Sequence, residues 1–316
     1  MRGTGLMKSC RHERRTALYA NLKRNWALYT MVLPGVVLLL VFNYIPMYGI
    51  VMAFQRFKPA LGFFRSPWAE PWYRYFLQLI RDPYFSRVFS NTVILGVYTL
   101  VWTFPAPILL ALLFNELRSN RFKRVMQTIS YMPNFLSTVI VVGLMKILFA
   151  TDGPVASLAT QLGLSWTNPF MLPSAFRSMY IGSAIWTGVG YNSIIYLAAI
   201  AGINNELYEA AIIDGATRIQ QIVHITIPSI MPTIVILLIF AISGIVGNDS
   251  TKILLMYSSA TYETADVIGT YTYRVGIEGN SQSYATAAGL FTTVISFTLL
   301  TLTNLLARKV SETSLW

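Results

Sequence analysis

Six long apolar segments constrain this chain of 316 residues more than any other feature of its sequence. Each is long enough to cross a bilayer, and a helix is the only open-chain structure that satisfies its own backbone groups in lipid. Charged residues make up 12% of the chain, about half the share expected of a soluble domain. The sequence therefore predicts an all-α integral membrane protein. To within a few residues, the predicted spans are 29–54, 88–115, 127–150, 178–203, 229–247 and 284–307.

The distribution of positive charge predicts how these spans are oriented. Seven of the 24 Lys and Arg residues lie in the first 24 positions. Four more lie between Arg118 and Arg124, in the connection after the second span. Basic segments beside membrane helices favour the cytoplasmic side, so we expect both termini and the stretch 204–228 to be cytoplasmic. A nucleic-acid-binding tail is the alternative for the N-terminal cluster, and we disfavour it because such tails commonly precede a first membrane helix.

The first outer connection, 55–87, departs from this pattern because it is basic. It also carries many aromatic residues, which indicates a small helix lying at the membrane interface. Its positive charge suggests an acidic oligosaccharide, such as a fragment of a uronic-acid polymer, as cargo. Docking of a binding protein and contact with lipid headgroups are the alternatives. Its basic residues are Arg56, Lys58, Arg65, Arg74, Arg81 and Arg87.

A polar stretch at 204–228 separates the fourth and fifth predicted spans. Gly215 follows Asp214 and can adopt a positive φ, so we expect a turn between two short helices there. We expect one buried apolar side on the first helix, and we expect Pro228 to end the second helix before the fifth span. On physical grounds alone, this stretch is either a docking site for a partner protein or an ordinary surface hairpin. The residues expected on the buried side are Leu207, Ala210, Ala211 and Ile213.

The spacing in this stretch resembles the coupling loop of permease subunits of binding-protein-dependent ABC importers. Two further stretches, NYIPMYGIVMAFQRFKP and DVIGTYTYRVGIEGNSQSYATAAGLF, resemble the polysaccharide and oligosaccharide branch of the carbohydrate importers. The resemblance covers most of the chain and is weakest over 55–87 and 151–180. In the coupling loop the matching residues are Glu209, Ala210, Ala211, Asp214, Gly215, Ala216, Ile225, Ile227 and Pro228.

The resemblance implies a six-helix transmembrane domain of a type I ABC importer, located in the bacterial cytoplasmic (inner) membrane. It implies a basic cytoplasmic tail (1–28), a first span with its outer loop (29–87), a permease core (88–308) and a cytoplasmic C-terminal tail (309–316). It also implies partners: a second, different permease, two ATPase subunits and an extracytoplasmic solute-binding protein. ATP and magnesium would be bound by the ATPases and not by this chain, which would itself be no enzyme. Glu209 and Gly215 would belong to the helix seated in a cleft of the ATPase.

The sequence contains no nucleotide-binding motif of its own. The tight glycine cluster Gly188-Val189-Gly190 lacks the following Lys-Ser/Thr that holds phosphates and magnesium. An ion-coupled secondary transporter would require acidic groups near the centres of the spans, and none is found there. A membrane enzyme would require clustered carboxylates or histidines, whereas the acidic residues are dispersed. A single cysteine and two distant histidines give metal binding no support.

Polar and aromatic residues on the fourth and fifth spans are candidates for a sugar path, because sugars bind through hydrogen bonds and flat aromatic faces. The alternative is that the aromatic residues anchor span ends at the interface. Asn91, Asn134 and Asn304 are weaker candidates, equally explained by hydrogen bonds between helices. The predicted path residues are Trp186, Tyr191, Asn192, Tyr196 and Asn248.

Overall fold

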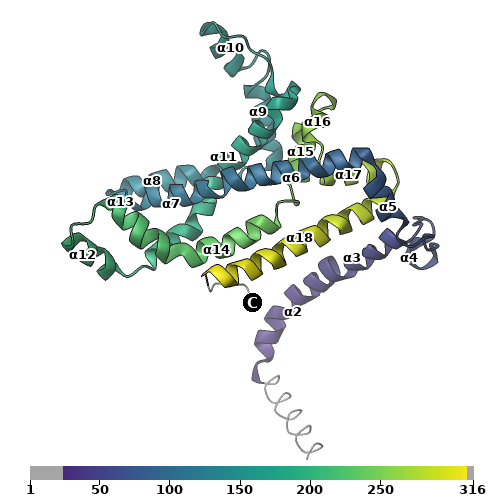
Figure 1. Cartoon of the computed structure of the whole chain (residues 1–316), viewed down its shortest axis with the longest axis horizontal. Helices are drawn as coiled ribbons and strands as arrows, with labels where there is room; N and C mark the ends of the chain where they lie inside the picture. Colours follow the sequence, from purple (N-terminus) through teal and green to yellow (C-terminus); the bar gives the residue numbers. More distant parts are fainter. Residues whose placement is uncertain (1–23, 312–316) are drawn as a thin grey trace, which may run out of the picture.

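We describe residues 24–311 of a computed structural model, shown in Figure 1. The predicted tails, 1–28 and 309–316, fall largely outside this range. Over the described residues the regular secondary structure is helical, apart from one isolated antiparallel bridge between Gln55 and Trp68. Five helices are long and apolar enough to span a membrane, and a bent pair brings the number to six. The all-helical membrane fold predicted from the sequence is confirmed.

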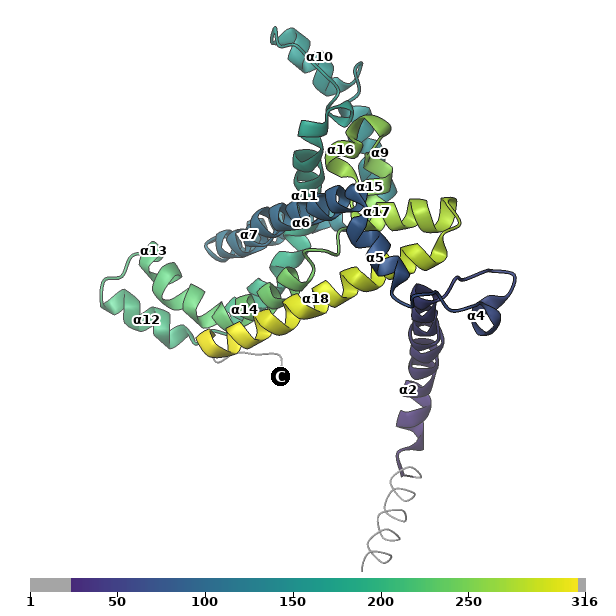
Figure 2. The same ribbon diagram turned by 45° about the vertical axis from the view of Figure 1, so that its right-hand side comes forward.

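The first predicted span is an arm set apart from the other helices, as Figure 2 shows. It comprises α2 (Trp26–Leu39), a π-helical turn (Leu40–Tyr44), α3 (Ile45–Met47) and a 3-10 helix (Tyr48–Phe54). None of the α2 side chains is buried, so this helix offers its whole apolar surface to lipid or to a partner subunit. The 3-10 helix at its end packs against α18 (Gln282–Ser311) and fixes the arm to the rest of the protein.

The main bundle consists of the remaining long helices. In chain order they are α6 (Pro83–Thr103), α7 (Pro105–Asn115), α11 (Pro173–Ala201), α14 (Ile227–Ser243) and α18. Helix α11 packs along α7, and α14 packs along α18. Glycines permit two close approaches: a Cβ atom added to Gly96 would lie 1.8 Å from the Ile245 carbonyl oxygen, and one added to Gly190 would lie 2.0 Å from that of Ser130.

The third predicted span, 127–150, is a bent pair of helices and not one continuous helix. The chain forms α8 (Asn120–Tyr131), a 3-10 turn (Met132–Phe135) and α9 (Thr138–Leu148), with a bend of 98° between the two arms. The cause is local: Pro133 lies in the 3-10 turn, and Ser137 adopts an extended backbone. The Ser137 hydroxyl then accepts from the Ile140 backbone N–H at 3.3 Å and caps the new helix.

The connections lie at two ends of the bundle. Helices α12 (Asn205–Ile213) and α13 (Arg218–Gln221) lie at the left end in Figure 1, toward which α18 runs with its C-terminal end. The short helices α4 (Gly62–Arg65) and α5 (Arg74–Arg81) lie at the opposite end, together with α17 (Ile268–Tyr273). Helix α10 (Pro154–Gln161) projects from the bundle, with a 3-10 turn (Pro169–Met171) leading back to α11.

The connection 248–283 follows the fifth predicted span, and we call it the outer connection because the predicted orientation places it outside the membrane. It consists of α15 (Ser250–Met256), a 3-10 turn (Ser259–Thr261), α16 (Tyr262–Ala265), α17 and a π-helical turn (Arg274–Glu278). Several of its side chains are fully buried, including Ile253 and Val267. This connection is therefore part of the packed core and not a surface loop.

Candidate functional site

The stretch 204–228 forms the predicted helical hairpin, and its turn is set by local hydrogen bonds. Gly215 has φ +79°, and its backbone N–H donates to the Ile212 carbonyl at 3.1 Å. The Ala216 N–H donates to the Ala211 carbonyl at 2.8 Å. This pair of bonds is a Schellman motif, the C-terminal cap that favours glycine at this position. The turn predicted from Asp214 and Gly215 is confirmed.

The second helix of the hairpin also begins with a local cap. The Thr217 hydroxyl accepts from the Gln220 backbone N–H at 3.4 Å, and the Gln220 side chain accepts from the Thr217 N–H at 2.7 Å. This reciprocal pair is a capping box. Caps at both helix ends need no contact from distant parts of the chain, so the hairpin has its shape before any partner arrives.

Two details predicted for the hairpin are wrong. Pro228 does not end the second helix: α13, a π-helical turn (Ile222–Thr226) and α14 form one helix from Arg218 to Ser243. The wider π turn accommodates the proline ring and its missing N–H, so Ile227 stays helical at φ −61°, ψ −48°.

The second wrong detail is the buried apolar side of α12, because none of its residues is buried. Ile213 is 85% exposed and Leu207 is 50% exposed. Glu209, Ala210, Asp214 and Gly215 are exposed as well, whereas Ala211 and Ala216 are partly covered. A contiguous apolar surface of this kind at the end of a protein usually marks an interaction site.

Two side-chain contacts attach the hairpin to the bundle. The Tyr208 hydroxyl lies 2.8 Å from the Thr226 hydroxyl and so joins α12 to the π turn. The Arg218 guanidinium pairs with the Glu116 carboxylate at 2.9 Å and joins α13 to the end of α7. Both partners of this ion pair are exposed to solvent, which limits its contribution to stability.

A cavity of about 320 Å³ lies between α6, α7, α11 and α14. Three of the predicted path residues line it: Asn192, Tyr196 and Asn248. The Asn248 side-chain amide donates to the Thr92 carbonyl at 3.0 Å, which fixes the segment after α14 against α6. The wall combines aromatic, amide and hydroxyl groups with aliphatic side chains, a composition suited to a sugar.

The other two predicted path residues lie outside this cavity. Trp186 is 46% exposed and lines an apolar groove of about 430 Å³ between α9 and α11. Tyr191 is 48% exposed, and its ring meets Phe135 edge-on at 6.5 Å. At about 100° per helical residue, Asn192 and Tyr196 share one face of α11, whereas Trp186 points about 80° away from Tyr196.

Two of the weaker asparagine candidates are buried in the bundle. The Asn91 amide donates to the carbonyls of Glu263 and Asp266, at 2.8 and 3.2 Å, and its oxygen accepts from Arg177. Asn91 therefore joins α6 to the outer connection, as the hydrogen-bonding alternative predicted. Asn304 is 2% exposed within α18, whereas Asn134 is exposed.

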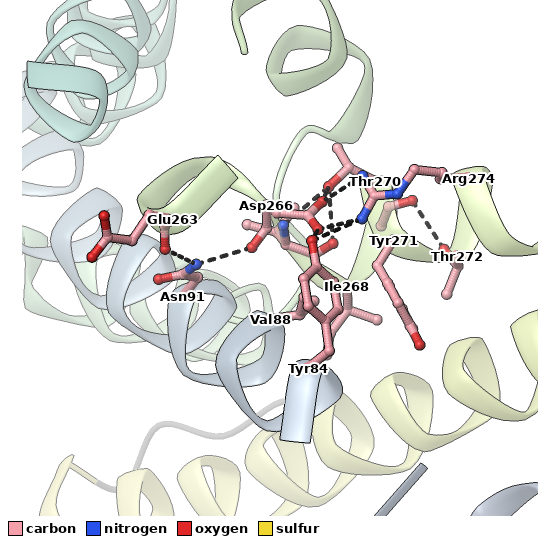
Figure 3. Close-up of polar contacts among 12 residues, drawn as sticks. Tyr84, Val88, Asn91, Glu263, Asp266, Ile268, Thr270, Tyr271, Thr272 and Arg274 are labelled. Carbon is pink, nitrogen blue, oxygen red and sulfur yellow. Dashed lines mark hydrogen bonds and ion pairs between the residues drawn. The ribbon is translucent and has the colours of Figure 1, made fainter. Parts of the chain in front are cut away.

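A polar network in the outer connection was not predicted from the sequence (Figure 3). The Asp266 carboxylate is 1% exposed and pairs with the Arg274 guanidinium. It also accepts from the hydroxyls of Tyr84 and Thr270. Burial alone would lower the pKa of Arg274, but the hydrogen bonds and the charge of Asp266 outweigh burial and raise it. The Arg274 guanidinium therefore remains charged throughout the physiological range.

A second acidic residue anchors the same region from the start of α6. The Asp82 carboxylate accepts from the Tyr271 hydroxyl at 2.9 Å and from the Tyr284 hydroxyl at 3.2 Å. Its other oxygen accepts from the Tyr84 backbone N–H at 2.9 Å and caps α6. Burial, together with these hydrogen bonds, raises the pKa of Tyr271. The outer connection is thus held by contacts between residues more than 170 positions apart in the sequence.

These features are those of a multi-pass membrane permease domain with an interior polar cavity and an exposed helical hairpin. Within residues 24–311, no group of His, Cys, Asp and Glu side chains is arranged to hold a metal ion. The comparisons with known proteins are more particular. Residues 103–312 match the family described as binding-protein-dependent transport system inner membrane component. The chain belongs to this family of ABC importer permeases.

Two curated relatives are similar over nearly the whole chain. The polygalacturonan/rhamnogalacturonan transport system permease protein YteP of Bacillus subtilis (strain 168) is 39% identical over 305 residues, covering 96% of this chain and 94% of its own. Protein LplB of the same organism is 38% identical over 298 residues, covering 94% of this chain and 93% of its own.

Solved structures agree with the fold. The crystal structure of a bacterial ABC transporter involved in the import of the acidic polysaccharide alginate contains a chain with a TM-score of 0.85 and 40% identity, covering 93% of this chain and 99% of that one. The crystal structure of a bacterial alginate ABC transporter in complex with an alginate pentasaccharide-bound periplasmic protein contains a chain with a TM-score of 0.84 and 40% identity, covering 94% of this chain and 99% of that one. The fold is the transmembrane domain of a type I ABC importer, in a multi-pass protein of the inner membrane.

Proposed function

We propose that this chain is the permease subunit of an ATP-driven importer of acidic oligosaccharides derived from uronic-acid polymers. The observation that carries the proposal is the 40% identity and TM-score of 0.85 with a chain of the alginate importer. The similarity to a permease for polygalacturonan and rhamnogalacturonan supports the same cargo class. An ion-coupled transporter gains no support from these relatives.

The exposed hairpin supports a coupling role for 204–228. Its tip presents Gly215 with no atom within 4 Å of an added Cβ, so another backbone can approach closely. We propose that ATPase subunits bind here, with Glu209, Ala210, Ala211, Asp214, Gly215 and Ala216 in the contact. In this proposal ATP and magnesium are bound by the ATPases, two in number, and this chain carries out no chemistry itself.

The opposite end supports contact with the cargo or its carrier. Helix α5 presents Arg74, Gln78 and Arg81 along an open groove of about 500 Å³ that Asp82 also lines, and both arginines are exposed. An exposed basic groove attracts anions. We propose that this end faces outward toward a solute-binding protein, that both termini are cytoplasmic, and that a different permease subunit completes the translocation path.

The proposal is tested by transport in proteoliposomes containing the chain, its co-purifying partners and ATP inside. We expect accumulation of uronate trisaccharides at least about tenfold faster than of neutral trisaccharides of equal length, a difference near 1.4 kcal/mol. Replacing ATP with a non-hydrolysable analogue should abolish uptake. A preference for the neutral sugar would overturn the cargo class, and uptake without ATP hydrolysis would overturn the transport mechanism.

A further inference from the structure

The cavity contains a negative charge that conflicts with an anionic cargo. Among the described residues that line it, Asp249 is the single charged one, and its side chain is exposed. Like charges a few ångströms apart repel each other. A carboxylate in this wall would therefore disfavour a uronate, unless a positive charge nearby compensates it.

Lys252 lies three residues further on, in the first turn of α15, and is 7% exposed. Its ammonium donates to the Tyr180 carbonyl at 3.3 Å and lies 4.8 Å from the centre of the Tyr180 ring. Tyr180 itself lines the cavity, so Lys252 is directly behind the wall. An isolated buried ammonium is costly, which makes its placement here informative.

Asp249 and Lys252 are linked through the Lys252 backbone N–H and through Tyr180, without a direct ion pair between the ammonium and the carboxylate. The Asp249 carboxylate accepts from the Lys252 backbone N–H at 3.0 Å and caps α15. The Asp249 backbone N–H donates to the Tyr180 hydroxyl at 3.2 Å. Burial lowers the pKa of the Lys252 ammonium to about 8, although the charge of Asp249 opposes that shift. The ammonium therefore remains mostly protonated at neutral pH.

We infer that Lys252 is a specificity-determining residue: its ammonium compensates the Asp249 carboxylate from behind the Tyr180 wall, so that the cavity admits acidic sugars. Lys252 does not line the cavity and acts through the charge of Asp249. Its role is to offset the charge of Asp249, and it makes no direct contact with the cargo. The inference rests on the proposed uronate cargo and adds a selection element within the membrane domain, separate from any selection by a binding protein.

A double-mutant cycle tests the inference in the assembled transport complex with a uronate trisaccharide as probe. Lys252→Met retains an unbranched side chain of similar length but leaves Asp249 uncompensated, and we expect uronate import to fall about tenfold. Asp249→Asn retains the helix cap, since asparagine caps as well as aspartate, and removes the charge. The double variant, with both charges removed, should import the uronate within about threefold of the wild type.

The outcomes separate the inference from the proposed function. If the wild-type complex does not import the uronate, the proposed cargo class fails. If it does, but the double variant imports no better than Lys252→Met, Lys252 has only a structural role and the inference fails. A second probe, the methyl-esterified trisaccharide, carries no charge. The ratio of its import rate to that of the free acid should be higher for Lys252→Met than for the wild type. An unchanged ratio would also overturn the inference.

Discussion

The two ends of this protein achieve order in opposite ways. The hairpin at 204–228 is shaped by hydrogen bonds among neighbours, through the Gly215 turn and the Thr217 cap, and α12 has no buried residue. The outer connection at 248–283 is shaped by contacts with α6 and α18, and its central carboxylate, Asp266, is 1% exposed. The hairpin is formed by its own local hydrogen bonds and leaves its apolar surface free. The outer connection takes its structure only when the bundle has formed.

The two ion pairs found within residues 24–311 make the same contrast. Asp266–Arg274 is buried on the acidic side and forms part of a network, whereas Arg218–Glu116 has side chains that are 63% and 31% exposed. Removing one partner of a buried pair leaves the other charge buried without compensation. When one partner of an exposed pair is removed, water solvates the remaining charge. The outer end therefore contributes stability, and the hairpin end contributes a surface for binding.

The largest effect is expected from Asp266→Asn, which retains the shape of the side chain and removes its charge. Arg274 then loses its counter-charge, and we expect a loss of about 3 kcal/mol in stability. Thermal unfolding of the detergent-solubilised protein measures it. The matched control is Glu116→Gln in the exposed pair, with a loss below about 1 kcal/mol. Equal losses of stability at the two sites would contradict the difference inferred between the buried and the exposed ion pair.

A second test concerns the close approach of α6 to the segment after α14. Gly96→Ala places a Cβ atom against the Ile245 carbonyl, so backbone must move, at a cost of about 1–3 kcal/mol. Gly35→Ala in the first span is the control, because nothing lies within 4 Å of its added Cβ. Thermal unfolding again gives the measurement. A neutral Gly96→Ala would mean that the outer end tolerates looser packing than we infer.

Gly215→Asp should cost only about 1–2 kcal/mol of local backbone strain, yet abolish substrate-stimulated ATP hydrolysis in the assembled complex. The reason is that the tip of the hairpin has no room for a charged side chain once a partner is docked. Gly163→Asp is a matched control, because Gly163 has φ +70° and equally open surroundings. Loss of stimulation in both variants would attribute the effect to strain and not to docking.

The smallest effect is expected from Tyr208→Phe, which removes the hydroxyl that bonds to Thr226. We expect about 1 kcal/mol and faster amide hydrogen exchange confined to α12. Tyr273→Phe is the control, because that ring is 45% exposed in the outer connection. Exchange that accelerates throughout the bundle would show that the hairpin is not an independent unit.

The hairpin could be predicted from the sequence because its determinants are adjacent. Asp214, Gly215 and Thr217 specify a turn and two caps within four positions. The outer network could not be predicted in this way, because Tyr84 and Asp266 are 182 positions apart and meet only after α6 and α17 have packed. Their residue types alone do not reveal the pairing.

The cavity was predicted in part for a related reason. Asn192 and Tyr196 are one turn apart on α11, so helical spacing places them together. Which face of α11 meets the cavity depends on the packing of α6, α7 and α14, so the sequence does not show that Trp186 and Tyr191 lie outside the cavity. Pro228 was a source of error, because a π turn carries the helix past it without a break, whereas Pro133 accompanies a bend of 98°.

That π turn has a mechanical consequence. The helix from Arg218 to Ser243 has 26 residues and is about 39 Å long, and it begins beside the hairpin tip and ends where Leu237 and Ala241 line the cavity. A break at Pro228 would have created a hinge that absorbs displacement. Because the helix is unbroken, a displacement of the hairpin would be carried along it to the cavity wall.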